Sequence, residues 1–392
     1  MARTAAHAEF SLLPSEFCLP FPEHAPVTQS LIGTHKQELD TPILCIDLDT
    51  MDANMKSMSD FIQSRGKEWR PHQKCHKTPA IAWKQMEYGA TGVTCAKVSE
   101  AEVMAAAGIE DILIANMIVG KRKVERVAAL CQHADPIVAV DHFAQVEPLA
   151  AACHARGVLC RVIIEVNIGL DRVGCRPGVD TLELAKGIDR LEGVDLVGIM
   201  GYEGHLLCIP DQVEKREKIE HGMNVLKHCR DLLLDANLDC SIVSAGGTGS
   251  YQITSDCEGV TELQAGGGIF ADPFYRNQCA VEGLEYALTI LATVVSRPVL
   301  ERAVLDSGRK THFPDQEPAI VKGHPGATVT RVSAEHCQLD LEGESRNLKI
   351  GDKVELIVGY ADHTSVLHDA FYGFRNDILE TVWPIAGRGK LQ

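Results

Sequence analysis

The sequence predicts an α/β protein in which a (β/α)8 TIM-type barrel is followed by a C-terminal antiparallel β domain. Three observations predict this. Short apolar runs alternate with helix-length stretches from residue 42 to about 265, and parallel strands need such helical crossovers. After about residue 275, strand patterns with short turns replace the helices. Glycine-rich loops follow the last two barrel strands, where barrels often bind phosphate.

The elements are expected in the following order. Residues 1–40 are rich in proline and should form an N-terminal arm. A strand over 42–47 and a helix over 49–65 come next. Eight barrel strands are expected over 68–75, 92–96, 111–116, 137–141, 158–167, 196–201, 241–245 and 259–265. The clearest helices between them are 99–107, 121–132, 143–155, 179–191 and 212–236.

Two domains follow the arm, a barrel over 41–277 and a β domain over 278–392. Strands of the second domain are expected over 287–296, 303–306, 327–333, 337–341, 353–357 and 380–384. The strand over 42–47 could pair with this β domain. An open doubly wound sheet is the alternative architecture for the first domain.

Composition excludes several classes of partner. A net charge of −16 over 392 residues disfavours nucleic acid and anionic membrane surfaces, which both need a basic face. The fourteen cysteines are scattered without a CxxC pair, which is typical of reduced thiols in a cytoplasmic protein. We find no signal-peptide pattern and no apolar run of membrane-spanning length.

The segment 70–79 suggests a reactive lysine. Lys74 ends the first barrel strand, and His72 and His76 flank it at alternating positions, so the three share one face if the strand persists. Lys77 would face elsewhere and balance charge. A desolvated lysine can lose its proton and attack an aldehyde cofactor as a Schiff-base former. The alternative is a solvated basic turn.

Two glycine loops suggest a phosphate site. The seventh strand ends in Ser244 and leads into Gly247, Thr248 and Gly249, and the eighth leads into Gly266, Gly267 and Gly268. Glycines let backbone N–H groups turn toward an anion. Flexible turns are the alternative reading.

Other candidates follow the fifth and sixth strands and lie in the β domain. Arg172 could hold an anionic ring oxygen of a cofactor or form a salt bridge within its own loop. His205, in the segment that includes Tyr202, could be a general base or a structural histidine. Asp362 beside His363 offers two ligand types for a metal, which is a weak signal.

Several motifs together resemble a known family. They are Thr41-Pro42 to Asp47-Leu48-Asp49, Arg70-Pro71-His72-x-Lys74-x-His76-Lys77, Ala96-Lys97-x-Ser99-Glu100-Ala101-Glu102, Gly247-Thr248-Gly249-Ser250-Tyr251, and Val382-Trp383-Pro384 with Arg388-Gly389. On these residues the chain resembles the D-threonine aldolase / eukaryotic-type D-serine dehydratase family. Its members are fold-type III pyridoxal 5'-phosphate (PLP) enzymes related to alanine racemase.

The resemblance implies that Lys74 carries PLP, that the two glycine loops bind its phosphate, and that Arg172 lies near its ring oxygen. We count His72, Tyr202 and Ser244 with the cofactor-binding residues. The resemblance also implies a homodimer in which the partner's β domain completes each active site.

The chain departs from this family at its metal pair. In the family a His-x-Asp or His-x-Cys pair precedes a Thr-x-x-(Leu/Val)-His-Asp run, which here is residues 364–369. The pair therefore falls on Tyr360 and Asp362, and neutral tyrosine is a poor ligand. Either Asp362 and His363 bind a divalent ion (Mn, Mg or Zn), or the ion is absent and Tyr360 is an acid–base group.

We therefore expect a PLP-dependent lyase for a small D-configured β-hydroxy amino acid. Retro-aldol cleavage is favoured over β-elimination because Asp362 matches the aldolase version of the pair. Lys74, His205 and Tyr360 are the catalytic candidates. The alternatives are a metal-free racemase or epimerase and, as a control hypothesis, a non-catalytic PLP carrier.

Overall fold

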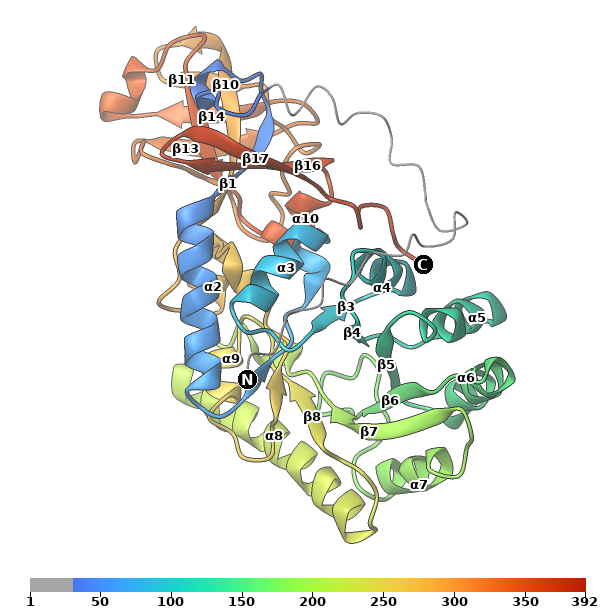
Figure 1. Ribbon diagram of the computed structural model, residues 1–392. Coiled ribbons are helices and arrows are strands. Elements are labelled where there is room, and N and C mark those ends of the chain that lie inside the picture. The colour runs from blue at the N-terminus through green and yellow to red at the C-terminus, as the bar shows by residue number, and fades with distance from the viewer. Residues whose placement is uncertain (1–30) are drawn as a thin grey trace, which may run out of the picture.

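A computed structural model describes residues 31–392 as two packed lobes (Figure 1). One lobe is a ring of parallel strands with helices outside it, and the other is a largely antiparallel sheet. Helix α2 (Leu48–Gln63) leaves the sheet lobe and runs along the barrel lobe. The predicted fold class is confirmed.

The barrel strands all pair in parallel, in the order β2-β9-β8-β7-β6-β5-β4-β3. A parallel bridge between His72 and Thr94 joins the two ends of this series, so the sheet closes. The eight predicted strands correspond to β2 (Glu68–Trp69), β3 (Val93–Cys95), β4 (Asp111–Ile114), β5 (Asp135–Val140), β6 (Cys160–Glu165), β7 (Val194–Met200), β8 (Ile242–Ala245) and β9 (Glu262–Leu263).

The helices begin and end where local chemistry dictates. The Asp211 carboxylate accepts from two backbone N–H groups at the start of α8, and Gly157 ends α6 in the left-handed conformation. The predicted helices are α4 (Val98–Ala106), α5 (Lys121–Leu130), α6 (Phe143–Arg156), α7 (Val179–Ile188) and α8 (Gln212–Asp235), and the short helix α9 (Tyr251–Thr254) follows the first glycine loop.

Three α-helices among the described residues were not predicted: the short α9, the short α10 (Ala361–Ser365) and one helix of nine residues. Helix α3 (Pro79–Glu87) connects the first two barrel strands. Pro79 occupies its first turn, where the missing N–H costs no hydrogen bond. This proline is therefore a helix start, although it resembles the end of a turn in the sequence.

The second lobe is a nine-stranded sheet in the order β11-β14-β13-β12-β15-β10-β1-β16-β17. Strand β1 pairs antiparallel with β10 and parallel with β16, so a strand that precedes the barrel in sequence belongs to the other lobe. The strands are β1 (Ile43–Asp47), β10 (Leu288–Val299), β11 (Arg302–Leu305), β12 (Ile320–Val321), β13 (Ala327–Val332), β14 (Cys337–Leu341), β15 (Lys353–Ile357), β16 (Ala370–Arg375) and β17 (Ile378–Pro384). Strands β12 and β16 were not predicted.

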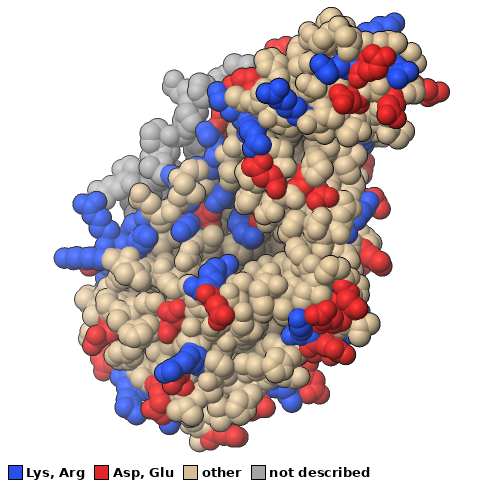
Figure 2. All heavy atoms as spheres, turned by 180° about the vertical axis from the view of Figure 1, so that it is seen from behind, with Lys and Arg blue, Asp and Glu red and all other residues tan. Residues whose placement is uncertain are grey.

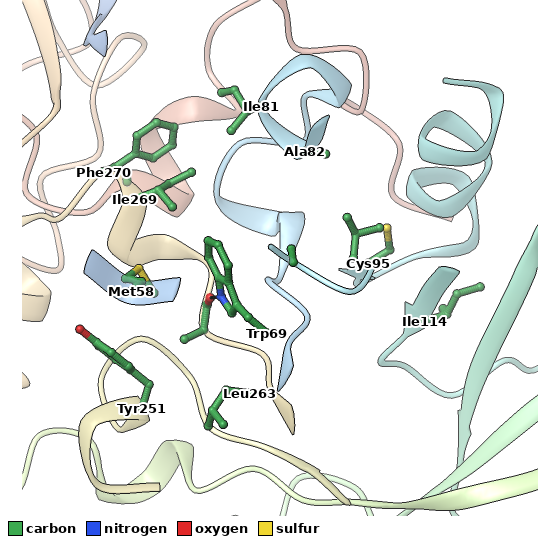
Figure 3. Packing of buried hydrophobic residues seen from close by; sticks show 14 of the residues in the cluster. Met58, Trp69, Ile81, Ala82, Cys95, Ile114, Tyr251, Leu263, Ile269 and Phe270 are labelled. Carbon is green, nitrogen blue, oxygen red and sulfur yellow. Dashed lines mark hydrogen bonds between the residues drawn. The ribbon is translucent and has the colours of Figure 1, made fainter. Parts of the chain in front are cut away.

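The hydrophobic core runs through both lobes, and Figure 3 shows the part that includes Met58 of α2 and Trp69 of β2. Trp69 of β2 is fully buried near Met58 and Ile269, and its indole N–H donates to the carbonyl of Ala265 at 2.7 Å. That bond satisfies the only polar atom of the side chain. It also ties the first barrel strand to the second glycine loop.

The predicted N-terminal arm lies mostly outside the described residues, which begin at 31. From there the chain docks on the sheet: Gly33 N–H donates to Leu379 and Lys36 N–H to Asp377. At the other end of the chain, Gln392 exchanges hydrogen bonds with Ser99 of α4. The C-terminal tail therefore returns to the barrel lobe.

Charges of both signs are interspersed over the face seen in Figure 2. Over residues 31–392, none of the helices combines the length and the apolar character needed to span a membrane. The thirteen cysteines in this range are all free thiols.

Candidate active site

Lys74 lies just beyond the first barrel strand, on a short 3-10 helix (Gln73–Cys75). The expected strand to residue 75 is wrong, because backbone pairing with the β9 side ends at His72 and the chain then turns. The ring Nδ1 of His72 caps this turn by accepting from Lys74 N–H at 3.3 Å. His72, Lys74 and His76 therefore do not share one face of a strand.

His76 and Lys77 serve the structure of this turn. His76 is fully buried, and its Nδ1 accepts from Thr78 N–H at 3.0 Å. Lys77 has a positive φ of 50° and forms a buried ion pair with Glu100. Glu100 also accepts from two backbone N–H groups of its own loop, at Ala96 and Lys97. Lys77 and Lys74 therefore pair with different carboxylates.

Lys74 forms an ion pair with Asp362 of the sheet lobe, with 2.8 Å between Nζ and Oδ2. The Asp362 carboxylate raises the pKa of Lys74, and this effect outweighs burial. The desolvated, neutral lysine that the sequence suggests is thus not the resting state of this site. Lys74 can act as a nucleophile only after its proton moves away.

Asp362 is the most constrained carboxylate here. It is buried, and its Oδ2 also accepts from the phenol of Tyr360 at 3.1 Å. Burial opposes its charge, but Lys74, His72 and the Tyr360 hydrogen bond together outweigh burial and hold the pKa of Asp362 below its usual value. Its second oxygen, Oδ1, is buried and has no hydrogen-bond partner among the described residues. An ionised carboxylate oxygen therefore remains open to a further donor.

The two glycine loops meet each other and the lysine turn. Gly267 N–H donates to the hydroxyl of Thr248 at 2.9 Å, which joins the loops after β8 and β9. A Cβ on Gly266 would lie 2.1 Å from the carbonyl oxygen of His72, so only glycine permits this approach. The thiol of Cys75 donates to the Gly266 carbonyl at 3.5 Å. The loops and Lys74 therefore form one continuous wall.

The glycine loops fit an anion. Among the described residues, the backbone N–H groups of Thr248, Gly249 and Gly268 have no hydrogen-bond acceptor, although Thr248 and Gly268 are buried. Buried N–H groups without acceptors are rare and favour a ligand with oxygen atoms. Ser244, in contrast, is fully buried and accepts from the Gln264 amide at 2.9 Å. It supports the loop.

Tyr202 and Arg172 line the adjacent side. The guanidinium of Arg172 lies 5.6 Å from the centre of the Tyr202 ring and 3.9 Å from Glu165. Arg172 therefore fits both predicted roles. Its side chain is mostly exposed and could reach an anionic oxygen of a cofactor, and it also pairs with the Glu165 carboxylate. Burial raises the pKa of Tyr202 to about 12, with Lys74 and Asp362 among the charges that act on it. Tyr202 is therefore a neutral phenol close to the ion pair.

His205 lies apart from this cluster, and His363 borders it through the ring of Tyr360. His205 is exposed on a short 3-10 helix (Gly204–Leu206), next to Gly169. His363 is exposed on α10 (Ala361–Ser365), and its ring packs edge-on against Phe313 and Tyr360 at 4.7 and 4.8 Å. The two members of the predicted metal pair thus differ, since Asp362 is buried and His363 faces outward.

Two residues that sequence reasoning missed support the site. Asp272 accepts from Ala361 N–H at 2.9 Å and from Tyr275 N–H at 3.0 Å, and burial raises its pKa to about 7. Lys215 of α8 donates to the Gly249 carbonyl at 2.8 Å from beneath the first loop. A buried acid or lysine in an otherwise amphipathic segment is the only signal that could have found them.

The chain matches known families along most of its length. Residues 46–272 match the alanine racemase N-terminal domain, and residues 287–374 match a serine dehydratase domain. A D-threonine aldolase of Arthrobacter sp. is 33% identical over 91% of this chain and 95% of its own length. A 3-hydroxy-D-aspartate aldolase of Paracoccus denitrificans is 32% identical over 92% and 95%.

Solved structures agree. The crystal structure of D-threonine aldolase from Filomicrobium marinum has a TM-score of 0.89 and 35% identity, covering 92% of this chain and 99% of that one. A D-threo-3-hydroxyaspartate dehydratase from Delftia sp. HT23 has a TM-score of 0.82 and 26% identity, over 89% and 98%. This chain therefore belongs to the D-threonine aldolase / D-serine dehydratase family of alanine racemase-like, PLP-dependent lyases.

Proposed function

We propose that this protein cleaves a D-configured β-hydroxy-α-amino acid by a retro-aldol reaction that yields glycine and an aldehyde. The main observation behind this proposal is that Oδ1 of the buried, ionised Asp362, next to Lys74, has no hydrogen-bond partner among the described residues. Such an oxygen fits a substrate hydroxyl as hydrogen-bond and proton acceptor. The relatives named as aldolases support this choice.

The residues of the site fit PLP. Lys74 would hold its aldehyde carbon covalently, and the free N–H groups of Thr248, Gly249 and Gly268 would bind its phosphate. Arg172 and Tyr202 would border the ring. When bound, the cofactor supplies an acceptor for the electron pair left on the substrate's α-carbon.

The residues themselves move the protons. Asp362 Oδ1 accepts the proton of the β-hydroxyl as the bond between the α- and β-carbons breaks, and the β-carbon leaves as an aldehyde. Tyr360, bonded to the other oxygen, holds the carboxylate in place. His205, at the exposed rim, remains our candidate for returning a proton from solvent to the glycine product.

β-Elimination is the less favoured lyase reaction. It requires a group that protonates the departing hydroxide. The groups beside Asp362 hold their protons tightly, because Asp362 raises the pKa of Lys74, and burial, reinforced by Asp362, raises that of Tyr360. They are therefore weak acids at neutral pH, whereas Asp362 is already ionised and can accept a proton.

The predicted metal pair does not fit a divalent ion well. Asp362 offers one free oxygen, and His363 faces outward. Within residues 31–392, neither belongs to a group of three potential ligands. We therefore propose no reaction step that uses a metal ion at this position.

A racemase is the second candidate, and one observation favours it. Tyr360 stands where family members carry a metal-binding histidine, and its hydroxyl shares an Asp362 oxygen with Lys74. A phenol and an amine in one cluster could exchange the α-proton.

For either reaction we propose a homodimer. In the single chain 44% of the Lys74 side chain is exposed, and the sheet lobe of the second subunit would cover it.

The deciding experiment incubates the PLP-loaded enzyme with D-threonine in deuterated buffer, with and without EDTA. We expect glycine and acetaldehyde in equal amounts, at the same rate in both samples. A keto acid product would assign elimination. Deuterium in the recovered threonine, without glycine, would assign racemisation. Loss of activity in EDTA would show that the reaction needs a metal ion. Sedimentation equilibrium of the same sample tests the dimer.

A further inference from the structure

Three cysteines from distant parts of the barrel meet at one point. Cys131 follows α5, Cys153 lies in the last turns of α6, and Cys160 begins β6. Their sulfur atoms all lie within 4.8 Å of one another, and the Cys160 thiol donates to the carbonyls of Pro136 and Arg161 at 3.9 and 3.5 Å. The chain assembles this triangle from segments separated by 22 and 7 positions in the sequence.

The triangle lies at the far end of the barrel from Lys74. Cys160 is the first residue of its strand, whereas Lys74 and the glycine loops follow the carboxyl ends of theirs. Cys153 and Cys160 are fully buried, and Cys131 is half-buried, so one edge of the triangle reaches solvent. The amino ends of barrel strands serve stability more often than catalysis.

The spacing suits a metal better than the alternatives. Tetrahedral zinc with Zn–S bonds of about 2.3 Å separates its sulfurs by about 3.8 Å, within the size of this triangle. A disulfide would join two of the thiols at about 2.05 Å and leave the third without a role. Thiols are weak hydrogen-bond donors, so three of them gain little by facing one another.

We propose that Cys131, Cys153 and Cys160 form a three-thiolate site for a thiophilic divalent cation of the Zn2+ class. Zn2+ would displace the three thiol protons and bind the three sulfurs, with a water molecule in the fourth position on the side of Cys131. The ion would join the ends of α5 and α6 to the start of β6. Its role would be structural, because the triangle lies at the amino end of β6 and Lys74 at the carboxyl end of the barrel.

The test is a titration of the full-length, PLP-loaded, reduced protein with Cd2+. Thiolate-to-cadmium charge transfer absorbs in the ultraviolet, and carboxylates such as Asp362 cannot produce this band. We expect it to rise to one equivalent in the wild type and to be lost in Cys131→Ser and Cys153→Ser. Cys208→Ser is the matched control, because Cys208 is an exposed cysteine outside the triangle, and its band should stay unchanged.

Thermal unfolding provides the second readout. Because a ligand that binds only the folded state stabilises it, added Zn2+ should raise the melting temperature of the wild type and of Cys208→Ser but not of Cys131→Ser. Cys131 is half-buried, so its variant should fold even if Cys153→Ser does not. A band that persists in Cys131→Ser, a wild type without a band, or a disulfide within the triangle would overturn the proposal.

Discussion

The two ends of the barrel use charged residues in opposite ways. At the amino end, Arg70 lies 2.9 Å from both Glu262 and Asp111. Arg161 pairs with Asp111 at 2.6 Å and with Asp135 at 2.8 Å. At the carboxyl end, Asp362 binds Lys74 and Tyr360 through one oxygen and leaves the other free.

This difference separates stability from function. In the amino-end network each charged group lies beside an opposite charge within the chain, although Arg70 Nη1 and Glu262 Oε1 have no hydrogen-bond partner among the described residues. At the carboxyl end the buried N–H groups of the glycine loops and Oδ1 of Asp362 have no hydrogen-bond partner among the described residues and can bind a ligand. A fold can tolerate such unsatisfied groups where a ligand provides the missing bonds. The following substitutions test whether the two ends can be separated experimentally.

The largest effect is expected for Lys74→Ala at the carboxyl end. Without the amine, PLP has no covalent attachment, so activity should fall to background and the absorbance of bound cofactor should be lost after dialysis. Thermal stability should fall as well, because Asp362, whose side chain is 6% exposed, loses its cation. Retention of the cofactor band would contradict the assignment of this lysine.

Asp362→Asn should lower kcat by about 10²- to 10⁴-fold, because the amide cannot accept the substrate's proton. It should also remove the charge that raises the pKa of Lys74. Lys74 would then lose its proton at lower pH, so the pH midpoint for PLP uptake by cofactor-free enzyme should fall. Tyr360→Phe, which keeps the carboxylate, is the control. A kcat within tenfold of the wild type would exclude Asp362 as the base.

Arg70→Met tests the amino end. It leaves the 4%-exposed side chain of Glu262 without its cation, and breaking a buried pair costs about 3–5 kcal/mol of unfolding free energy. Arg161→Met is the matched control, because one of its partners, Asp135, is largely exposed and a surface pair contributes about 0–1 kcal/mol. Urea unfolding measures both. Equal losses in the two variants would remove the distinction between buried and exposed pairs.

The smallest effect concerns His312 in the sheet lobe, which takes no part in either end of the barrel. Burial lowers its pKa to about 4, so the folded state holds it neutral, while the unfolded chain binds a proton near pH 6.5. Its stabilising contribution is present above pH 6.5 and is lost as the pH falls, by up to about 1.4 kcal/mol per unit. His312→Phe should flatten this dependence in urea unfolding between pH 7 and 5. The exposed His336→Phe should not.

Much of this molecule could be predicted from the sequence. All eight barrel strands were expected, because short apolar runs alternate with helical stretches along most of this region. Lys74 and the glycine loops were identified because strand ends in a barrel converge. Helix α3 and strand β16 were missed, since Pro79 resembles a turn and Gly373 interrupts the strand pattern.

The sequence by itself determined the alternation of strands and helices and the glycine loops, because these depend on side-chain periodicity and on local backbone freedom. Only the tertiary structure decided which groups meet. Asp362 reaches Lys74 from 288 positions away, and Cys131, Cys153 and Cys160 converge from three elements. Such contacts depend on how whole elements pack, and no local pattern encodes the distance between residues of different elements.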